Sequence, residues 1–175
     1  SWPSRKTEAW KYTPVNKIER ATFKQVHATQ EIATQIPNLN AIDLVFVDGL
    51  FDEAASSSAL PAGLTINQLA DGEHISWALE SFKDTKPDRH FFGLINDTLA
   101  TQGCIIDVAS DAHIAQPIRI LQSFHQGSQS HTRILMRLGE RSSASVIEQL
   151  QGDSLSLNTS FAEYQIADNA KLEHY

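Results

Sequence analysis

The chain has 175 residues, with 14 Lys and Arg against 21 Asp and Glu and a net charge of −7 at pH 7. This length allows one domain, or one domain with a small appendage, and a chain of this length can bury a core without the help of disulfides or metal ions. The acidic balance argues against a nucleic-acid surface, which needs clustered positive charge to displace counterions from phosphates. The longest apolar run is only a few residues, so no segment is expected to span a bilayer.

Cys104 is the only cysteine, so the chain cannot form an internal disulfide. The start, Ser1 to Lys6, has no apolar segment of the kind found in signal peptides. Together these two features predict a cytoplasmic location. Cys104 itself lies in the apolar run Cys104–Ile106, which predicts a buried structural residue. A nucleophile would need a nearby base and a lowered pKa, and the sequence indicates neither; catalysis or cluster ligation by Cys104 is the alternative.

The first 24 residues carry a local excess of positive charge. Against Glu8 and Glu19 they hold six basic side chains: Arg5, Lys6, Lys11, Lys17, Arg20 and Lys24. A solvated basic face is the default interpretation, and a docking surface for an acidic partner is the alternative. Within this segment, Ser4 predicts the N-cap of a short helix over Arg5–Tyr12, and Pro14 predicts its end.

A hairpin is predicted next. Leu44–Val47 is a compact β-prone run, and Asp48–Gly49 and then Leu50–Phe51 follow it directly. Asp-Gly suits the type I′ turn, which needs positive φ at both central residues. A further short strand is predicted over Leu64–Ile66, after a turn that contains Pro and Gly.

Two helices are predicted before the chain becomes β-rich. The first covers His74–Phe82. The second covers Arg89–Ala100, with Asp88 as its N-cap and Gly103 placed to end it. Three apolar side chains recur at i, i+4 and i+8 of the second helix and are expected to form its buried face: Phe91, Ile95 and Leu99.

From Cys104 onward, short β-prone runs alternate with polar turns, and no helical period competes. The predicted strands are Cys104–Val108, Ile118–Phe124, Thr132–Leu138, Ala144–Leu150, Phe161–Ile166 and Lys171–Tyr175. In the third run, Ile134, Met136 and Leu138 alternate with arginines, which is the period of a strand.

A weak repeat runs through this β-rich region. Its copies are Val108–Ile114, Leu138–Ala144 and Ile166–Leu172, so they begin 30 and then 28 residues apart. Each copy starts apolar, forms a polar turn with a small residue at its fifth place, and ends apolar. This period favours stacked β-coils, and a β-sandwich with recurring turn chemistry is the alternative. Stacked coils would leave an open edge at Tyr175, so we expect the natural protein to continue beyond it.

No motif of a catalytic or metal site is present. The seven histidines are His27, His74, His90, His113, His125, His131 and His174, and none has the spacing of a metal motif. His125 and His131 flank a Gly/Ser turn and are expected in surface loops; a metal site completed by a distant carboxylate is the alternative. The chain has no Gly-rich phosphate loop and no nucleophile elbow. We therefore predict no catalytic, cofactor-binding or metal-ligating residue.

The string Pro3–Pro14, PSRKTEAWKYTP, resembles the signature near the start of the SufD family, which belongs to the bacterial Suf iron–sulfur cluster assembly system. Later segments look like this family in the same order: Leu44–Gly49, Phe92–Leu99 followed by Gly103, Gln116–Ile118, Ala144–Gln149 and Ala170–Tyr175. The resemblance covers essentially the whole chain. The first string is specific, whereas the β-repeats are not.

The resemblance implies a mainly β fold, a right-handed parallel β-helix flanked by helical segments. It implies a mixed α/β region over 1–103 and the first coils of an incomplete β-helix, truncated, over 104–175. Family members pair with the paralogue SufB and dock a SufC ATPase, which uses ATP, while nascent clusters assemble on the complex. The implied role is therefore a non-catalytic scaffold that binds no cofactor through this segment.

The resemblance carries no ligand or catalytic residue to this chain, because the family's partner-docking and cluster-related parts lie beyond Tyr175. Trp10 and Tyr12 carry the recognition, and both are expected to be packing anchors of the N-terminal segment.

Two other functions stand beside the scaffold. A β-helical carbohydrate-active enzyme would place carboxylates along one groove, although the lack of a signal peptide counts against it. The SufB paralogue is the second alternative, but the Arg5–Thr13 string favours the D-type subunit. An exposed final strand also predicts self-association, for example as a homodimer.

Overall fold

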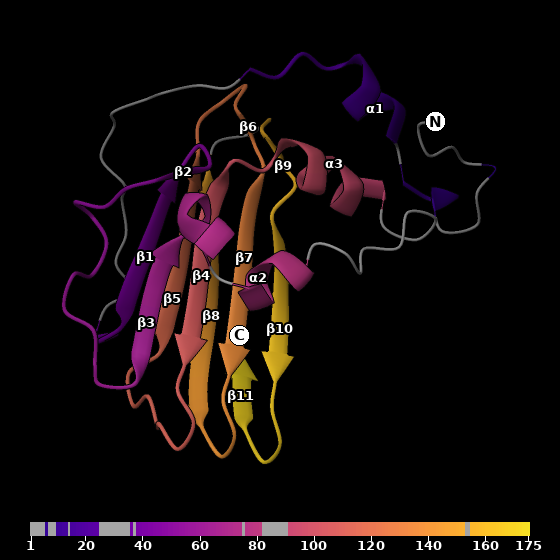
Figure 1. Cartoon of the computed structure of the whole chain (residues 1–175). Helices are drawn as coiled ribbons and strands as arrows, with labels where there is room; N and C mark the ends of the chain where they lie inside the picture. The colour runs from indigo at the N-terminus through magenta and orange to yellow at the C-terminus, as the bar shows by residue number, and fades with distance from the viewer. Residues whose placement is uncertain are drawn as a thin grey trace.

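The computed structural model describes residues 6, 10–13, 15–24, 36, 38–74, 76–81, 91–152 and 155–175. The chain is mainly β, with mixed sheets (Figure 1). Its strands are β1 (Ile42–Val47), β2 (Leu50–Phe51), β3 (Leu64–Gln68), β4 (Gln102–Val108), β5 (Ile118–Phe124), β6 (Gln129–Ser130), β7 (Thr132–Leu138), β8 (Ser143–Gly152), β9 (Leu157–Asn158), β10 (Phe161–Ile166) and β11 (Lys171–His174). The helices are α1 (Val15–Arg20), the 3₁₀ helix η2 (Leu69–His74), α2 (Ser76–Ser81) and α3 (Phe91–Leu99).

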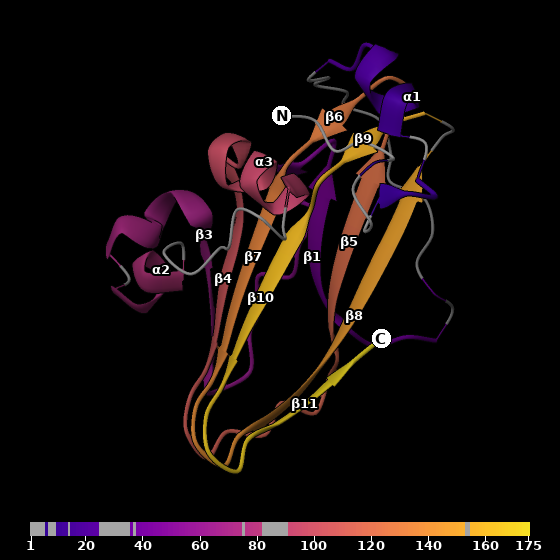
Figure 2. The ribbon, with the colours of Figure 1, turned by 90° about the vertical axis from the view of Figure 1, so that its right-hand side faces the viewer.

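Two sheets face each other and enclose the core, as Figure 2 shows from the side. One sheet has the order β11-β8-β5-β1-β2 and the other β10-β7-β4-β3, while β6 and β9 form a small third sheet. From β4 onward the chain passes back and forth between the two larger sheets. As a result β4, β7 and β10 lie parallel in one sheet, and β5, β8 and β11 lie parallel in the other.

The register of these parallel strands reproduces the sequence repeat. Val108 pairs with Leu138, and Leu138 pairs with Ile166, so the strands are offset by 30 and then 28 residues. Paired residues in parallel strands point to the same side of the sheet, so these three apolar side chains form one ladder. Val108 and Leu138 are buried in the core, whereas Ile166 on the edge strand β10 is 51% exposed. The prediction that the repeat marks equivalent, stacked positions is confirmed.

The turns after these strands are equivalent in backbone conformation. The fourth residue of each repeat copy has a positive φ: 63° at Asp111, 55° at Arg141 and 57° at Asn169. The turns also hydrogen-bond to one another, since the Asp111 amide donates to the Glu140 carbonyl at 2.9 Å and the Arg141 amide to the Asp168 carbonyl at 3.1 Å. Each turn therefore supports the next one in the stack.

The inner faces of both sheets are filled by apolar side chains. Fully burying a side chain of the Leu, Ile or Met class stabilises the fold by about 1.5–3 kcal/mol, which makes this core the main source of stability. The buried members of the cluster are Ile42, Leu44, Phe46, Leu64, Cys104, Ile106, Val108, Ile114, Ile118, Ile120, Ile134, Met136, Leu138, Ala144 and Val146.

Most predicted strands are found where the sequence places them. The predictions for β5, β7 and β10 agree with the structure at both ends, and those for β4, β8 and β11 differ by a few terminal residues. The hairpin is confirmed as well, because β1 and β2 pair antiparallel with Val47 opposite Leu50. Asp48 and Gly49 have φ of 48° and 82°, as a type I′ turn requires.

The helix predictions need correction. Half of the helix predicted over Arg5–Tyr12 lies outside the described residues, and α1 begins at Val15, directly after Pro14. The predicted helix over His74–Phe82 is α2, shortened to Ser76–Ser81 and preceded by η2; Phe82 lies outside the described residues. The helix predicted over Arg89–Ala100 is described from Phe91 as α3.

The predicted buried face of α3 is wrong in part, since Phe91 and Ile95 are partly buried but Leu99 is not. Leu99 is 47% exposed, whereas Gly93 and Asn96 are buried. The orientation of α3 is explained by hydrogen bonds of a polar side chain: the Asn96 amide donates to the backbone carbonyls of Thr132 at 2.9 Å and Thr159 at 2.7 Å. Because a buried amide must find such partners, this side chain sets which face of α3 contacts the sheet.

The strands of the first half extend the sheets of the second half. β1 pairs parallel with β5, and β3 pairs antiparallel with β4. α2 covers the outer face of the second sheet, where Ala78 packs against Ile105 and Leu135. The division of the chain into 1–103 and 104–175 stays a prediction.

A buried arginine of β7 attaches α3 to the sheet that contains β4, β7 and β10. Arg133 is 0% exposed, forms ion pairs with Asp97 of α3 and with Glu163 of β10 at 3.5 Å, and lies 4.4 Å from the ring centre of Phe161. Its neighbour in register is Gly103 of β4, where a Cβ would lie 1.8 Å from the Arg133 carbonyl oxygen. Glycine is therefore required at this position for β4 to approach β7.

Replacing Gly103 by alanine is expected to destabilise the fold by about 3 kcal/mol, since the methyl group can be accommodated only by moving the backbone of β7. Gly127→Ala is the control: no atom lies within 4 Å of its Cβ, and only its φ of 77° adds strain, about 1 kcal/mol. Urea unfolding followed by circular dichroism measures both variants. Equal losses of stability would contradict the close approach of β4 and β7.

Candidate functional site

Cys104 is a core residue. It lies on β4, faces the space between the sheets and is 1% exposed. Burial raises the pKa of its thiol far above the usual range, so the reactive thiolate is not formed near neutral pH. The prediction of a buried, structural cysteine is confirmed.

We expect Cys104 to resist the thiol reagent DTNB in the native chain at pH 8 and to react at once in guanidinium chloride. The physical reason is that the thiolate is both disfavoured and inaccessible while the sheets are closed. Cys104→Ser combined with Ser110→Cys provides the control, because Ser110 is exposed in the first stacked turn and a thiol there should react without denaturant. Rapid, stoichiometric labelling of the native chain would contradict the buried placement.

His125 secures the hairpin turn. Asp48 is buried in the turn between β1 and β2, where it accepts a hydrogen bond from the His125 amide at 2.8 Å and lies 2.7 Å from His125 Nδ1. Both carboxylate oxygens are thereby used, which joins the turn to the end of β5. His125 has a structural role in this arrangement.

His131 has a different environment. Its Nδ1 lies 2.6 Å from the Thr159 hydroxyl, and its Nε2 is buried with no hydrogen-bond partner among the described residues. Burial lowers the pKa of the imidazole, which favours the neutral ring. The prediction that His131 lies on the surface is therefore wrong in part, since its ring is enclosed on one side by the strands around it.

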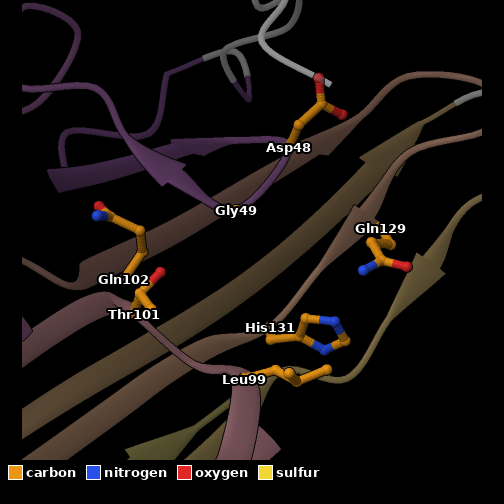
Figure 3. Close-up of a pocket in the computed structure, with 7 residues that line it drawn as sticks. All are labelled: Asp48, Gly49, Leu99, Thr101, Gln102, Gln129 and His131. Atoms are coloured by element: carbon orange, nitrogen blue, oxygen red, sulfur yellow. The ribbon is translucent and has the colours of Figure 1, made fainter. Parts of the chain in front are cut away.

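The ring of His131 lines a small cavity of about 150 Å³, shown in Figure 3. The other lining residues are Asp48, Gly49, Leu99, Thr101, Gln102 and Gln129. The Asp48 carboxylate points away from the other labelled side chains, toward its partner His125. The cavity thus presents amide, hydroxyl and neutral imidazole groups, which suit ordered water rather than acid–base chemistry.

The two histidines do not converge on one site, because His125 is held by Asp48 and His131 by Thr159. Within the part of the chain that the structure describes, no group of three or more His, Cys, Asp or Glu side chains is placed to hold a metal ion. That the chain has no catalytic or cofactor-binding residue stays a prediction.

An open groove of about 640 Å³ crosses the ends of β4, β7 and β10. Asp107 and Arg137 line it, and they form a two-pronged ion pair at 3.0 and 2.6 Å. Arg137 also lies 5.0 Å from the ring centre of Trp77. A glycosidase needs two carboxylates that flank a substrate bond, one of them with a raised pKa. The Asp107 carboxylate is instead committed to its arginine, so this groove does not resemble such a site.

The basic N-terminal surface is partly described. Its exposed cations are Lys6, Lys11, Lys17, Arg20 and Lys24. The segment is joined to the body through Lys24, whose amide donates to the Gly127 carbonyl at 3.0 Å and whose carbonyl accepts from the Gln129 amide at 2.9 Å. The positive charge is therefore held next to the β6 end of the stack.

The two aromatic residues of the N-terminal string differ in role. Trp10 is half-buried and meets Phe92 of α3 edge to face, with ring centres 5.4 Å apart, so the prediction of a packing anchor is confirmed for Trp10. For Tyr12 the prediction is wrong, because its side chain is 87% exposed. Its ring instead lies 5.5 Å from the Lys11 ammonium group.

Comparison with known proteins places the chain in a family. A family model described as the SufBD protein N-terminal region matches residues 1–120. The chain is also 28% identical, over 185 aligned residues, to the iron–sulfur cluster assembly protein SufD of Escherichia coli strain K12. This alignment covers 98% of the chain but 41% of the relative, so the chain spans less than half of that relative's length.

The resemblance carried by the N-terminal string Pro3–Pro14 is confirmed by both matches. No helix among the described residues is long and apolar enough to cross a membrane. Since the family model matches more than half of its residues, the chain belongs to the SufBD protein family, in its N-terminal region.

Proposed function

We propose that this chain is the N-terminal portion of a non-catalytic scaffold subunit of an iron–sulfur cluster assembly complex. The observation that carries the proposal is the match of the SufBD N-terminal region to residues 1–120, together with likeness over 98% of the chain to a SufD named for this assembly. The buried, inert thiol of Cys104 and the ion-paired groove agree with a role in binding rather than in chemistry.

The stacked strands are proposed to be the first coils of a right-handed parallel β-helix, over 104–175, that continues in the full-length protein. Three features support this: the alternation of β4 to β11 between two sheets, the parallel register and the three equivalent turns. Open strand edges at β10 and β11 would then receive the next coil.

The proposed partners are a SufB-like paralogue and a SufC-like ATPase, bound in the cytoplasm through regions mostly beyond Tyr175. The segment itself would hold no cofactor, whereas the complex would handle a nascent cluster and its ATPase would use ATP. The SufB alternative is not separated by the family model, which describes both subunits, but the curated relative is a SufD. A β-helical carbohydrate-active enzyme has less support, since the groove offers no pair of available carboxylates.

Co-purification tests the proposal. The full-length gene product and the 175-residue chain, each with a cleavable tag, are co-expressed with the neighbouring ATPase and paralogue subunits. The full-length protein is expected to retain both partners, and the 175-residue chain neither. Full-length protein that folds, elutes as a defined species and retains neither partner would overturn the assembly role.

A further inference from the structure

Three polar side chains occupy core-facing positions in the last strands of the stack. Each is the last residue of a ladder, that is, of a row of residues paired in register across parallel strands, and the earlier residues of that row are apolar and buried. The ladders are Ile106–Met136–Tyr164, Leu44–Ile120–Glu148 and Ile118–Val146–His174. Because paired residues of parallel strands point the same way, Tyr164, Glu148 and His174 face the interior.

The reactive atoms of these side chains meet at one point between the two sheets. Glu148 Oε1 lies 3.0 Å from Tyr164 Oη and 3.0 Å from His174 Nε2, and the last two atoms are 3.3 Å apart. Tyr164 comes from β10 of one sheet, and Glu148 and His174 come from β8 and β11 of the other. Three potential ligand atoms therefore form a nearly equilateral triangle.

This triangle has the dimensions of a metal site. Ligand atoms lie about 2.0–2.2 Å from a zinc-type ion, so two neighbouring ligands are separated by about 2.8–3.1 Å at octahedral angles and about 3.3–3.6 Å at tetrahedral angles. One imidazole nitrogen with two oxygen ligands suits first-row divalent cations better than Mg²⁺ or Ca²⁺, which prefer oxygen throughout. Three protein ligands with an open position for water is also a common arrangement around zinc.

We propose that Glu148 Oε1, Tyr164 Oη and His174 Nε2 bind one divalent first-row cation of the Zn²⁺ type, whose coordination is completed by water. In the 175-residue chain the site is within reach of solvent, because the side chain of His174 is 43% exposed and that of Glu148 is 23% exposed. Figure 2 looks onto this side of the molecule, where β10, β8 and β11 are the outermost of the described strands.

Binding through the phenol releases a proton. Without a cation, burial and the neighbouring Glu148 carboxylate raise the pKa of Tyr164, so its hydroxyl keeps its proton and donates it to Glu148 in a hydrogen bond. When the cation binds, the Oη–H bond breaks, the oxygen donates its electron pair to the metal, and the proton leaves to solvent. The affinity must then increase as the pH rises.

No local spacing in the sequence signals this site. Its three residues lie on three strands of two sheets and come together only through the register of the stack. One of them is tyrosine, so the group contains fewer than three His, Cys, Asp or Glu side chains, in agreement with the lack of such a group among the described residues. The site does not depend on the proposed assembly role.

The experiment is a titration of the tag-free 175-residue chain with Co²⁺, followed by its visible absorption, and then displacement by Zn²⁺. One equivalent of Co²⁺ is expected to bind, more tightly at pH 8 than at pH 6.5. Glu148→Gln, His174→Ala and Tyr164→Phe are each expected to weaken binding by about tenfold or more. His113→Ala is the matched control and should bind as the native chain does: His113 is an exposed histidine whose Nδ1 lies 2.9 Å from the Ser143 hydroxyl, outside the triangle.

Native chain that produces no Co²⁺ spectrum overturns the proposal, whatever the variants do. So does a folded His174→Ala or Glu148→Gln chain that binds as the native chain does. Native affinity in Tyr164→Phe overturns it too, because only two of the three ligands would then be in use. Circular dichroism confirms that each variant is folded.

Discussion

In-register parallel pairing of successive strands is the constraint on which the rest of this structure depends. A residue on β4 is fixed above its equivalent on β7, 30 positions later, and β7 is fixed above β10, 28 positions later. Each ladder therefore has a single orientation along its whole length, toward the core or away from it. A slip of one residue would exchange the two faces and move the buried pair Val108 and Leu138 toward solvent.

The same constraint acts on the outer faces, where it decides which charges become neighbours. Asp43 is paired in register with Arg119, and Asp107 with Arg137, and both pairs form two-pronged ion pairs. Like charges placed directly opposite each other would be destabilising, so opposite charges at these paired positions favour the observed register. Arg133 differs from these two arginines, because its own side chain is 0% exposed, while its partners Asp97 and Glu163 keep 19% and 28% of their side chains exposed.

Predictions from sequence succeed where a structure is decided locally. The bounds of β5, β7 and β10 follow from short β-prone runs, and the β1–β2 turn follows from Asp48–Gly49, whose positive φ few other residue pairs adopt easily. Such predictions fail where the structure of a segment depends on a partner that is distant in sequence. The buried face of α3 depends on the carbonyls of Thr132 and Thr159, which lie 36 and 63 residues from Asn96. No periodicity of apolar residues within α3 can contain that information.

The environment of a candidate site residue was likewise predictable only where neighbours in the sequence determine it. The inert character of Cys104 was predictable from its apolar neighbours, whereas the enclosure of the His131 ring and the exposure of Tyr12 were not, because both depend on contacts distant in sequence. The N-terminal string identified the family without any of these contacts, since a family signature is local even when a binding site is not.

Once the register is known, a polar residue in a ladder of otherwise apolar, core-facing residues can be recognised, and such positions can be compared with one another. Gln122 also interrupts a core ladder, but it does so alone: its amide nitrogen donates to the Ser160 hydroxyl at 3.0 Å, and its Oε1 has no partner among the described residues. A single polar side chain of this kind brings no second ligand atom to the same point. Tyr164, Glu148 and His174 depart together, from both sheets and at one end of the stack, and direct three ligand atoms at one point. Simple satisfaction of hydrogen bonds would not require three independent ladders to change character side by side, whereas the binding of a cation would.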